Sequence, residues 1–171
     1  MRESIAGAWL YSLILIFMVI LVGFVSVSLN YNKAYKLKTS VVNIIEQFQG
    51  INKDSVGTIG KHLDNNGYIN GKTCRKLFKN GEKYIEINNG VASNVKTKGA
   101  SDTESKPAQV CVTRSLASKN DSETSVQRDY YYDVYMFFSF SLPVFGDVFK
   151  FTVTGSTNAI HYPNDTNAWG N

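Results

Sequence analysis

The residues of this chain whose types could support catalysis are few and widely spaced. The segment Asn70 to Thr73 reads NGKT, which matches the end of a phosphate-binding loop. That loop has four residues between its glycines and follows a strand, whereas three residues separate Gly67 from Gly71 and no strand pattern precedes them. We therefore expect no nucleotide site in this segment.

Histidines and carboxylates also lack the spacing of a catalytic or metal site. His62 and His161 lie 99 positions apart, whereas metal ligands recur at short spacings. The sequence contains no nucleophile elbow and no paired-carboxylate motif. It therefore predicts a protein that is not an enzyme and that uses no metal or other cofactor.

The two cysteines have a spacing that suits a covalent cross-link. Cys74 and Cys111 are 37 positions apart in the polar part of the chain, and their even number suits one disulfide in an oxidising compartment. Such a bond would stabilise the fold by about 2–4 kcal/mol. Two buried free thiols are the alternative.

The charge of the chain gives weak support to a nucleic-acid partner. The net charge is +4, and because Arg2 and Glu3 cancel, residues 31–171 carry it all, with their lysines spread among predicted loops. A nucleic-acid surface would cluster basic and aromatic residues. We expect a solvated, mildly basic surface with no nucleic-acid partner, and we infer no small-molecule substrate.

An uncharged apolar run begins close to the N-terminus. It covers the 25 residues from Ile5 to Leu29. As a helix this run is roughly 37 Å long, enough to cross a hydrocarbon core of about 30 Å. Ser26 to Ser28 fits a small-x-small cleavage site, but a secretory signal has an apolar region of only about 7–15 residues. The prediction is a transmembrane anchor over residues 1–30 followed by a domain over 31–171.

Two features of the chain disagree about its orientation in the membrane. Lys33, Lys36 and Lys38 follow the run, while only Arg2 and the α-amino group precede it, and this balance favours a cytoplasmic C-terminal domain. The cysteine pair and the Asn-, Ser- and Thr-rich composition favour the opposite side. We expect a single-pass protein of the cell membrane whose C-terminal domain is extracytoplasmic.

The helix is predicted to continue beyond the membrane as an amphipathic stalk over residues 31–49. Apolar residues recur there at spacings of 3, 4, 4 and 3, which places them on one face. Gly50 then provides a stop. The result is one helix from about residue 4 to 49. The apolar stripe consists of Ala34, Leu37, Val41, Ile45 and Phe48.

A short second helix and several strands are predicted after the stalk. The helix would be capped by Asp54 or Ser55 and would carry three apolar residues on one face, namely Val56, Ile59 and Leu63. The sheet is expected within residues 82–157, with the polar segment 92–107 as a surface loop and the tail from Asn158 exposed, as an edge strand or a loose end. The strands are expected at 83–87, 108–114, 130–142 and 147–155.

The last two strands predict a hairpin of defined register. Apolar residues occupy even positions in 130–142 and odd positions in 147–155. A four-residue loop from Pro143 to Gly146 pairs residues whose numbers sum to 289, so that Phe140 lies opposite Phe149 and the apolar faces coincide. This face and the stalk stripe are each half of a core, and we expect them to pack together.

The opposite face of the hairpin carries a row of aromatic residues, Tyr131, Tyr135 and Phe137. Exposed aromatic residues in a row can mark a binding surface. A second buried face or a covering loop is the alternative.

The order of these elements resembles type IV pilin-like proteins, and most of all the pseudopilins of bacterial tight-adherence (Tad) systems. The residues that carry the resemblance are ESIAGAWL at 3–10, the stalk 31–49, and FSLPVFGDVFKFTVTGST at 140–157. It implies an α+β fold in which a long N-terminal helix packs on a small antiparallel sheet. It also implies an extracytoplasmic structural subunit of a pilus or of a type II-related secretion apparatus, with the membrane and other pilin-like subunits or secretion components as partners. The alternative is a stand-alone, membrane-tethered extracellular binding domain.

The resemblance gives Glu3 a role in assembly. In the family, a glutamate near the helix start pairs with the N-terminal amine of a neighbouring subunit. The helix dipole favours a carboxylate there by about 0.3–1 kcal/mol, and in a low dielectric it would need a cation. The alternative places Glu3 in the headgroup region. The residues expected to pack against neighbouring helices are Glu3, Ile5, Ala6, Gly7, Trp9 and Leu13.

Overall fold

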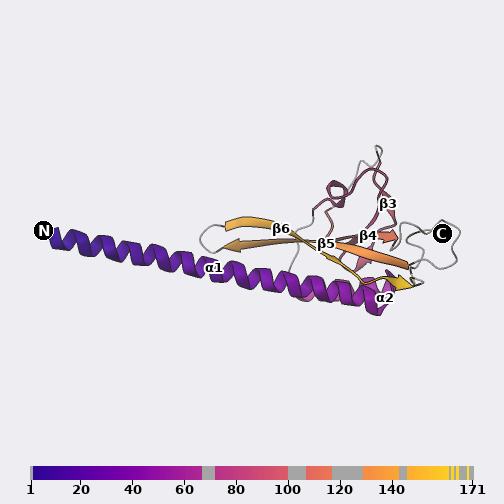
Figure 1. Cartoon of the computed structure of the whole chain (residues 1–171), viewed down its shortest axis with the longest axis horizontal. Helices are drawn as coiled ribbons and strands as arrows, with labels where there is room; N and C mark the ends of the chain where they lie inside the picture. Colours follow the sequence, from indigo (N-terminus) through magenta and orange to yellow (C-terminus); the bar gives the residue numbers. More distant parts are fainter. Residues whose placement is uncertain are drawn as a thin grey trace.

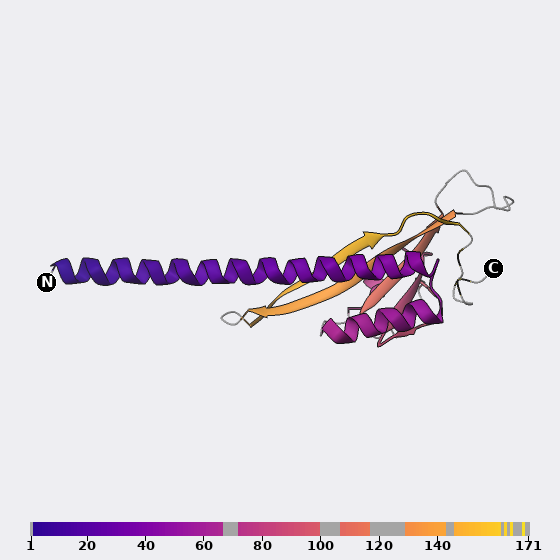
Figure 2. The ribbon, with the colours of Figure 1, turned by 90° about the horizontal axis from the view of Figure 1, so that it is seen from below.

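A long helix lies on one face of an antiparallel sheet in the computed structural model, and a second helix lies beside it (Figures 1 and 2). The expected α+β class is thereby confirmed. The structure describes residues 2–66, 72–99, 107–116, 129–142 and 146–161, together with 163, 165 and 169. For residues 2–8, 65–66, 140–142 and 146–149 it describes only the backbone.

All strand pairs among the described residues are antiparallel. The main order of the sheet is β2-β1-β4-β5-β6, with β3 paired to β1 and β7 paired to β5. The helices are α1 (Arg2–Gln47), α2 (Lys53–Asn66) and the short 3-10 helix η1 (Cys74–Lys76). The strands are β1 (Lys83–Asn88), β2 (Val91–Ala92), β3 (Lys96–Thr97), β4 (Val110–Leu116), β5 (Asp129–Leu142), β6 (Gly146–Ser156) and β7 (Ile160–His161).

Helix α1 is one unbroken helix, as expected, and it ends in a turn closed by main-chain hydrogen bonds. The amide of Gly50 donates to the carbonyl of Ile45 over 2.9 Å, and the amide of Gln49 donates to that of Glu46 over 3.1 Å. This is the Schellman pattern. Its left-handed position is held by Gln49, with φ of 53°, and Gly50 follows with φ of 133°. The stop expected at Gly50 is confirmed, one residue beyond the left-handed position.

The core lies between the C-terminal half of α1 and the sheet. Ala34, Val41 and Ile45 are completely buried, and they belong to one cluster with apolar residues of β1, β4, β5 and β6. Full burial of a Val or Ile side chain contributes roughly 1.5–3 kcal/mol. The predicted packing of the stalk stripe on the sheet is confirmed.

Helix α2 begins with a cap that differs from the predicted one. The side-chain Oδ1 of Asn52 accepts the amide of Ser55 over 2.8 Å, and Ser55 Oγ accepts the amide of Asn52 over 2.9 Å. Asn52 is therefore the cap, because its oxygen satisfies a free amide of the first turn, and the expectation of Asp54 or Ser55 was wrong. The predicted apolar face is confirmed, since Val56, Ile59 and Leu63 are buried.

The backbone of α2 touches the turn between β1 and β2. A Cβ added to Gly60 would lie 2.2 Å from the Cα and 2.6 Å from the amide nitrogen of Gly90. Asn89 and Gly90 have φ of 48° and 72°, which a two-residue hairpin turn requires. Gly60 thus allows a contact that any side chain would block.

The β5–β6 hairpin has the predicted register. Phe140 pairs with Phe149 and Phe138 with Phe151. Near its end, however, Leu142 pairs with Gly146 after a register shift. The expected four-residue loop was therefore one residue too long, because in the irregularity between Phe140 and Leu142 two residues of β6 lie opposite one residue of β5.

The segment 92–107 carries more structure than the sequence indicated, and the tail agrees with its prediction only in part. Within the supposed loop 92–107, β3 pairs with β1, and Ala92 belongs to β2, which also pairs with β1. In the tail, β7 pairs with β5, which confirms the edge-strand alternative there, and Trp169 is buried in the main core. The expected exposure of the tail was therefore wrong at Trp169; Tyr162 lies outside the described residues.

Candidate functional site

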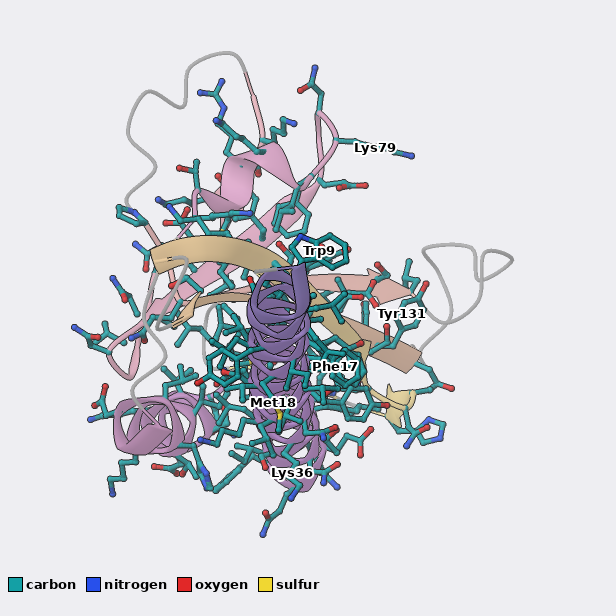
Figure 3. All side chains as sticks on the ribbon, turned by 90° about the vertical axis from the view of Figure 1, so that its left-hand side faces the viewer. Trp9, Phe17, Met18, Lys36, Lys79 and Tyr131 are labelled. Atoms are coloured by element: carbon teal, nitrogen blue, oxygen red, sulfur yellow. A yellow bond between two sulfur atoms is a disulfide. The ribbon has the colours of Figure 1, made fainter. Side chains whose placement is uncertain are left out.

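The N-terminal half of α1 projects from the rest of the molecule (Figures 1 and 2). Every side chain from Trp9 to Val22 is exposed, and Trp9 has an exposed fraction of 75%. Figure 3, which looks along the helix from this end, shows Trp9, Phe17 and Met18 around its surface. The helix is long and apolar enough to cross a membrane.

So large an apolar surface needs a partner. Leaving apolar area in water costs about 25 cal/mol per Å², and contiguous exposed patches of more than a few hundred Å² mark interaction sites. Lipid chains, neighbouring helices, or both could cover this surface. The projecting half of α1 is therefore the candidate functional site.

The predicted assembly residues lie on this projecting half. Trp9 and Leu13 are exposed and free to contact another helix. The backbone is helical at Glu3, Ile5, Ala6 and Gly7, whose side chains lie outside the described part of the chain. The pairing of Glu3 with a neighbouring subunit therefore stays a prediction.

Tyrosine and lysine side chains surround α1 where it meets the sheet. Tyr31 and Tyr35 are more than half exposed, and the Tyr31 ring stacks on Phe151 with centroids 6.0 Å apart. The ammonium group of Lys38 lies 4.1 Å from the centre of the Tyr35 ring, and Lys36 points away from the sheet (Figure 3). Tyrosines and lysines are typical of membrane–water interfaces.

The predicted disulfide is present and lies on the sheet face opposite α1. Cys74 of η1 is bonded to Cys111 of β4, with their Cα atoms 5.7 Å apart. The bond holds the segment around η1 against the sheet. Phe78 from this segment stacks on Tyr84 with centroids 5.0 Å apart. A second, smaller apolar core results.

This second core removes much of the predicted aromatic binding surface. Phe137 is only 4% exposed, and Tyr135 is half-buried with its ring edge-on to Phe78 at 5.3 Å. The prediction of a binding surface was therefore wrong at Phe137, where the alternative of a second buried face is confirmed. Tyr131 is half-buried.

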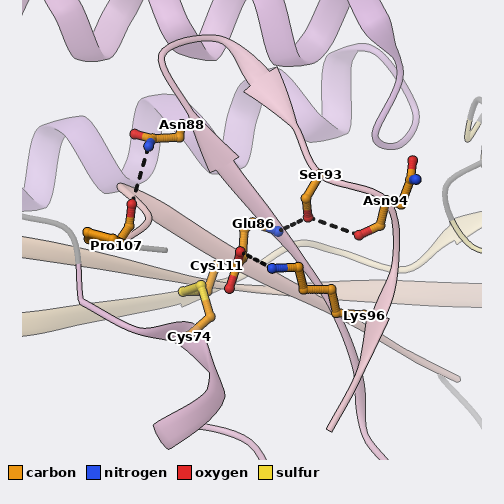
Figure 4. A network of polar contacts seen from close by, with 8 residues as sticks. All are labelled: Cys74, Glu86, Asn88, Ser93, Asn94, Lys96, Pro107 and Cys111. Carbon is orange, nitrogen blue, oxygen red and sulfur yellow. Dashed lines mark hydrogen bonds and ion pairs between the residues drawn. A yellow bond between two sulfur atoms is a disulfide. The ribbon is translucent and has the colours of Figure 1, made fainter. Parts of the chain in front are cut away.

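A partly buried ion pair joins β1 to β3 beside the disulfide (Figure 4). Lys96 Nζ donates to Glu86 Oε2 over 2.7 Å, and the Glu86 amide donates to Ser93 Oγ over 3.0 Å. The pair lines a pocket of about 360 Å³ together with Pro107 and Ala108. The Glu86 carboxylate in this pocket is already paired with Lys96. The described residues contain no group of three His, Cys, Asp or Glu suited to a metal ion.

Sequence reasoning missed a polar cluster centred on Asp165. One carboxylate oxygen accepts the amide of Ile51 over 2.7 Å; the other accepts Arg114 Nη1 over 2.9 Å and the Tyr132 hydroxyl over 2.7 Å. Burial, and then the bond to Asp165, raises the pKa of Tyr132 well above its ordinary value. The cluster ties the tail to the α1–α2 junction. The 114 positions between Ile51 and Asp165 offered no local signal for it.

Comparisons of the chain with protein-family models, with curated proteins and with solved structures find no match. The resemblance to pilin-like proteins therefore stays a prediction from the sequence.

Proposed function

We propose that this protein is a membrane-anchored, extracytoplasmic structural subunit of pilin-like type, in a bacterial pilus or in a type II-related secretion or tight-adherence apparatus. One observation carries the proposal. A single helix, α1, is uncovered and apolar in its first half and forms part of the domain core in its second half.

This arrangement suits a subunit whose orientation matters. A tether needs only an apolar segment joined to its domain by a flexible linker. In α1 the apolar half continues into the core without a break, so the domain keeps a set orientation relative to the anchor. A subunit that packs side by side with its neighbours needs such an orientation.

The rival function, a tethered binding domain, loses support from the burial of Phe137. Its aromatic surface was to consist of Tyr131, Tyr135 and Phe137, and only Tyr131 and Tyr135 keep partly exposed rings. The largest exposed apolar surface lies instead on α1, from Trp9 to Val22. This distribution favours assembly through the helix.

Site-specific photo-crosslinking in cells tests the proposal. A photoreactive amino acid is placed in the full chain, with the disulfide intact, at Trp9 or Leu13. Met18 is the matched control, because it is exposed and lies about 180° around the helix from Trp9 at about 100° per residue. We expect discrete adducts to a second copy of this chain or to another subunit from Trp9 and Leu13, and weaker ones from Met18.

Adducts to lipid alone at all these positions would refute assembly and favour the tethered domain. Equal protein adducts on both faces would support assembly but refute the predicted stripe.

Orientation is tested separately with an amine reagent that does not cross membranes. Lys33 and Lys36 are exposed beside the apolar run, so each should be modified when intact cells are treated. Protection of both lysines in intact cells, with modification after lysis, would refute an extracytoplasmic domain.

A further inference from the structure

Four lysines lie at the end of the domain from which the apolar half of α1 emerges. Three of them follow the apolar run on α1, and the fourth is on β6, one residue before Phe151, which stacks on Tyr31. Gly155, further along β6, lies against Lys38 and Val42, so β6 and α1 run in the same direction and the fourth lysine is level with the start of the stalk. We call these residues the lysine collar: Lys33, Lys36, Lys38 and Lys150.

The collar keeps an excess of positive charge. Lys33, Lys36 and Lys150 are exposed, and no collar lysine belongs to an ion pair within the described part of the chain. Residues 31–45 and 134–156 together contain these four lysines and one acid, Asp147, whose side chain lies outside the described residues. An anionic partner would therefore find local charge that the domain itself does not neutralise.

The apolar run sets the level of the collar relative to a bilayer. Val25 and Leu29 are more than half exposed and gain from lying in lipid, so the hydrocarbon boundary falls near Leu29, where the run ends. Lys33 and Lys36 follow Leu29 by about 6 and 10 Å along the helix, at 1.5 Å per residue. The headgroup region is about 5–8 Å deep on each side, and charges act over about 8 Å more at physiological ionic strength. The collar therefore lies within range of the headgroups.

The collar side chains lean toward the membrane. Side chains on a helix are tilted toward its N-terminus, which is the direction of the apolar run. Lys38 shows this tilt, since its ammonium group lies 4.1 Å from the centre of the Tyr35 ring, three residues nearer the run. Tyr31 and Tyr35 are more than half exposed at this level, and tyrosine is typical of membrane–water interfaces. Ammonium and phenol groups thus face the bilayer surface together.

We propose that the lysine collar binds anionic phospholipid headgroups at the surface of the membrane that α1 enters. Lysine ammonium groups bind phosphate oxygens as compact charges, and each lysine near an anionic surface strengthens binding by about fivefold. The inference rests on the membrane anchoring within the proposed function. It depends neither on assembly into a pilus nor on the side of the membrane that holds the domain.

Spin-labelled lipids test this selectivity. The full chain, with its disulfide intact, is placed in phosphatidylcholine vesicles that contain a trace of spin-labelled phosphatidylcholine or phosphatidylglycerol. The motionally restricted fraction of each labelled lipid gives its relative association constant with the protein. We expect phosphatidylglycerol to be preferred at least twofold. This preference should largely disappear at 1 M salt, where the screening length is about 3 Å.

Two triple variants separate the collar from net charge. Replacing Lys33, Lys36 and Lys150 by glutamine should remove most of the preference; Lys38 is kept because it packs on Gly155. The matched control replaces three exposed lysines of the segment around η1 and β1, where Lys79 lies on the far side of the molecule from Lys36 (Figure 3), and it should keep the preference. The control residues are Lys76, Lys79 and Lys83.

Each failure has a distinct signature. A preference that is unchanged in the collar variant, that falls equally in the control variant, or that survives 1 M salt in the wild type would overturn headgroup binding by the collar. Equal association of both lipids with the wild type would also overturn it and leave the anchor intact. The absence of a restricted fraction for either lipid would instead refute the membrane anchoring within the proposed function.

Discussion

The close contact between Gly60 and Gly90 makes a prediction in which two glycines of one helix respond with opposite sign. Replacing Gly60 by alanine places a Cβ 2.2 Å from the Gly90 Cα, and both groups belong to backbone that no rotamer change can move. Helix α2 or the β1–β2 turn must then shift. Overpacking of this kind costs typically about 1–3 kcal/mol. Alanine recovers about 0.8–1 kcal/mol of helix propensity, so we expect a net loss of up to about 2 kcal/mol.

Gly57 provides the matched control. It lies one turn earlier in α2, and a Cβ there would meet nothing within 4 Å. Gly57→Ala should therefore keep only the propensity gain of about 0.8–1 kcal/mol. The measurement is thermal unfolding of the full chain in detergent, followed by near-UV circular dichroism with the disulfide oxidised.

The expected shifts are small but of opposite sign. A change of 1 kcal/mol moves the Tm by roughly 2–4 °C for a protein of 150–250 residues. Gly57→Ala should raise the Tm by about that amount, and Gly60→Ala should lower it. A Tm that rises in both variants would refute the close approach of α2 to the turn.

Three further predictions concern the disulfide and the Asp165 cluster. Reducing the Cys74–Cys111 bond opens a loop of 37 residues and should lower the free energy of unfolding by about 4 kcal/mol in the chain-entropy model, measured by urea unfolding with and without reductant. Asp165→Asn should lower the free energy of unfolding by about 3 kcal/mol, because Arg114 loses its carboxylate partner. Asp129→Asn removes the carboxylate of a more exposed pair and should change the free energy of unfolding by less than about 1 kcal/mol. The raised pKa of Tyr132 means that, as the pH rises, the unfolded chain releases the Tyr132 proton before the folded chain does. The contribution of Tyr132 to stability is therefore full below about pH 10 and falls above about pH 10 by up to about 1.4 kcal/mol per pH unit. Thermal melting of Tyr132→Phe should show a flatter dependence of stability on pH above about pH 10.

Elements with a clear periodic pattern could be predicted from the sequence. The stalk of α1 follows a helical period, and the parity of apolar residues set the β5–β6 register, including Phe138 opposite Phe151. A one-residue slip would have moved every apolar side chain to the wrong face, so few registers were possible. The loop length was predicted less well, because a bulge near Leu142 compensates for one residue without changing the faces.

The second core is a feature that the periodicity of apolar residues in the sequence cannot predict. Alternation placed Tyr135 and Phe137 on the face opposite α1, but it cannot say whether another segment covers that face. Here the cover comes from the segment of Phe78, held by the disulfide. The tail is a similar case, since Asp165 is bound by residues far away in the chain.

One further turn has a local signal in the sequence. Asn89-Gly90 follows an apolar strand and precedes Val91, and this dipeptide is a strong indicator of a two-residue hairpin turn. The structure has that turn between β1 and β2. For the candidate site, the apolar run was evident from composition, whereas the contact of α1 with β6 at Tyr31 and Phe151 is tertiary and has no local signal.

The unbroken course of α1 has a mechanical consequence. The helix contains no proline, and kinks in helices usually need one or another identifiable break. A pull on the apolar end would therefore not be absorbed by a hinge. It would pass along the helix axis and act as shear between α1 and β6, at the contacts of Tyr31 with Phe151 and of Lys38 with Gly155. The domain would carry axial load through side-chain packing, with its disulfide outside the path of the force.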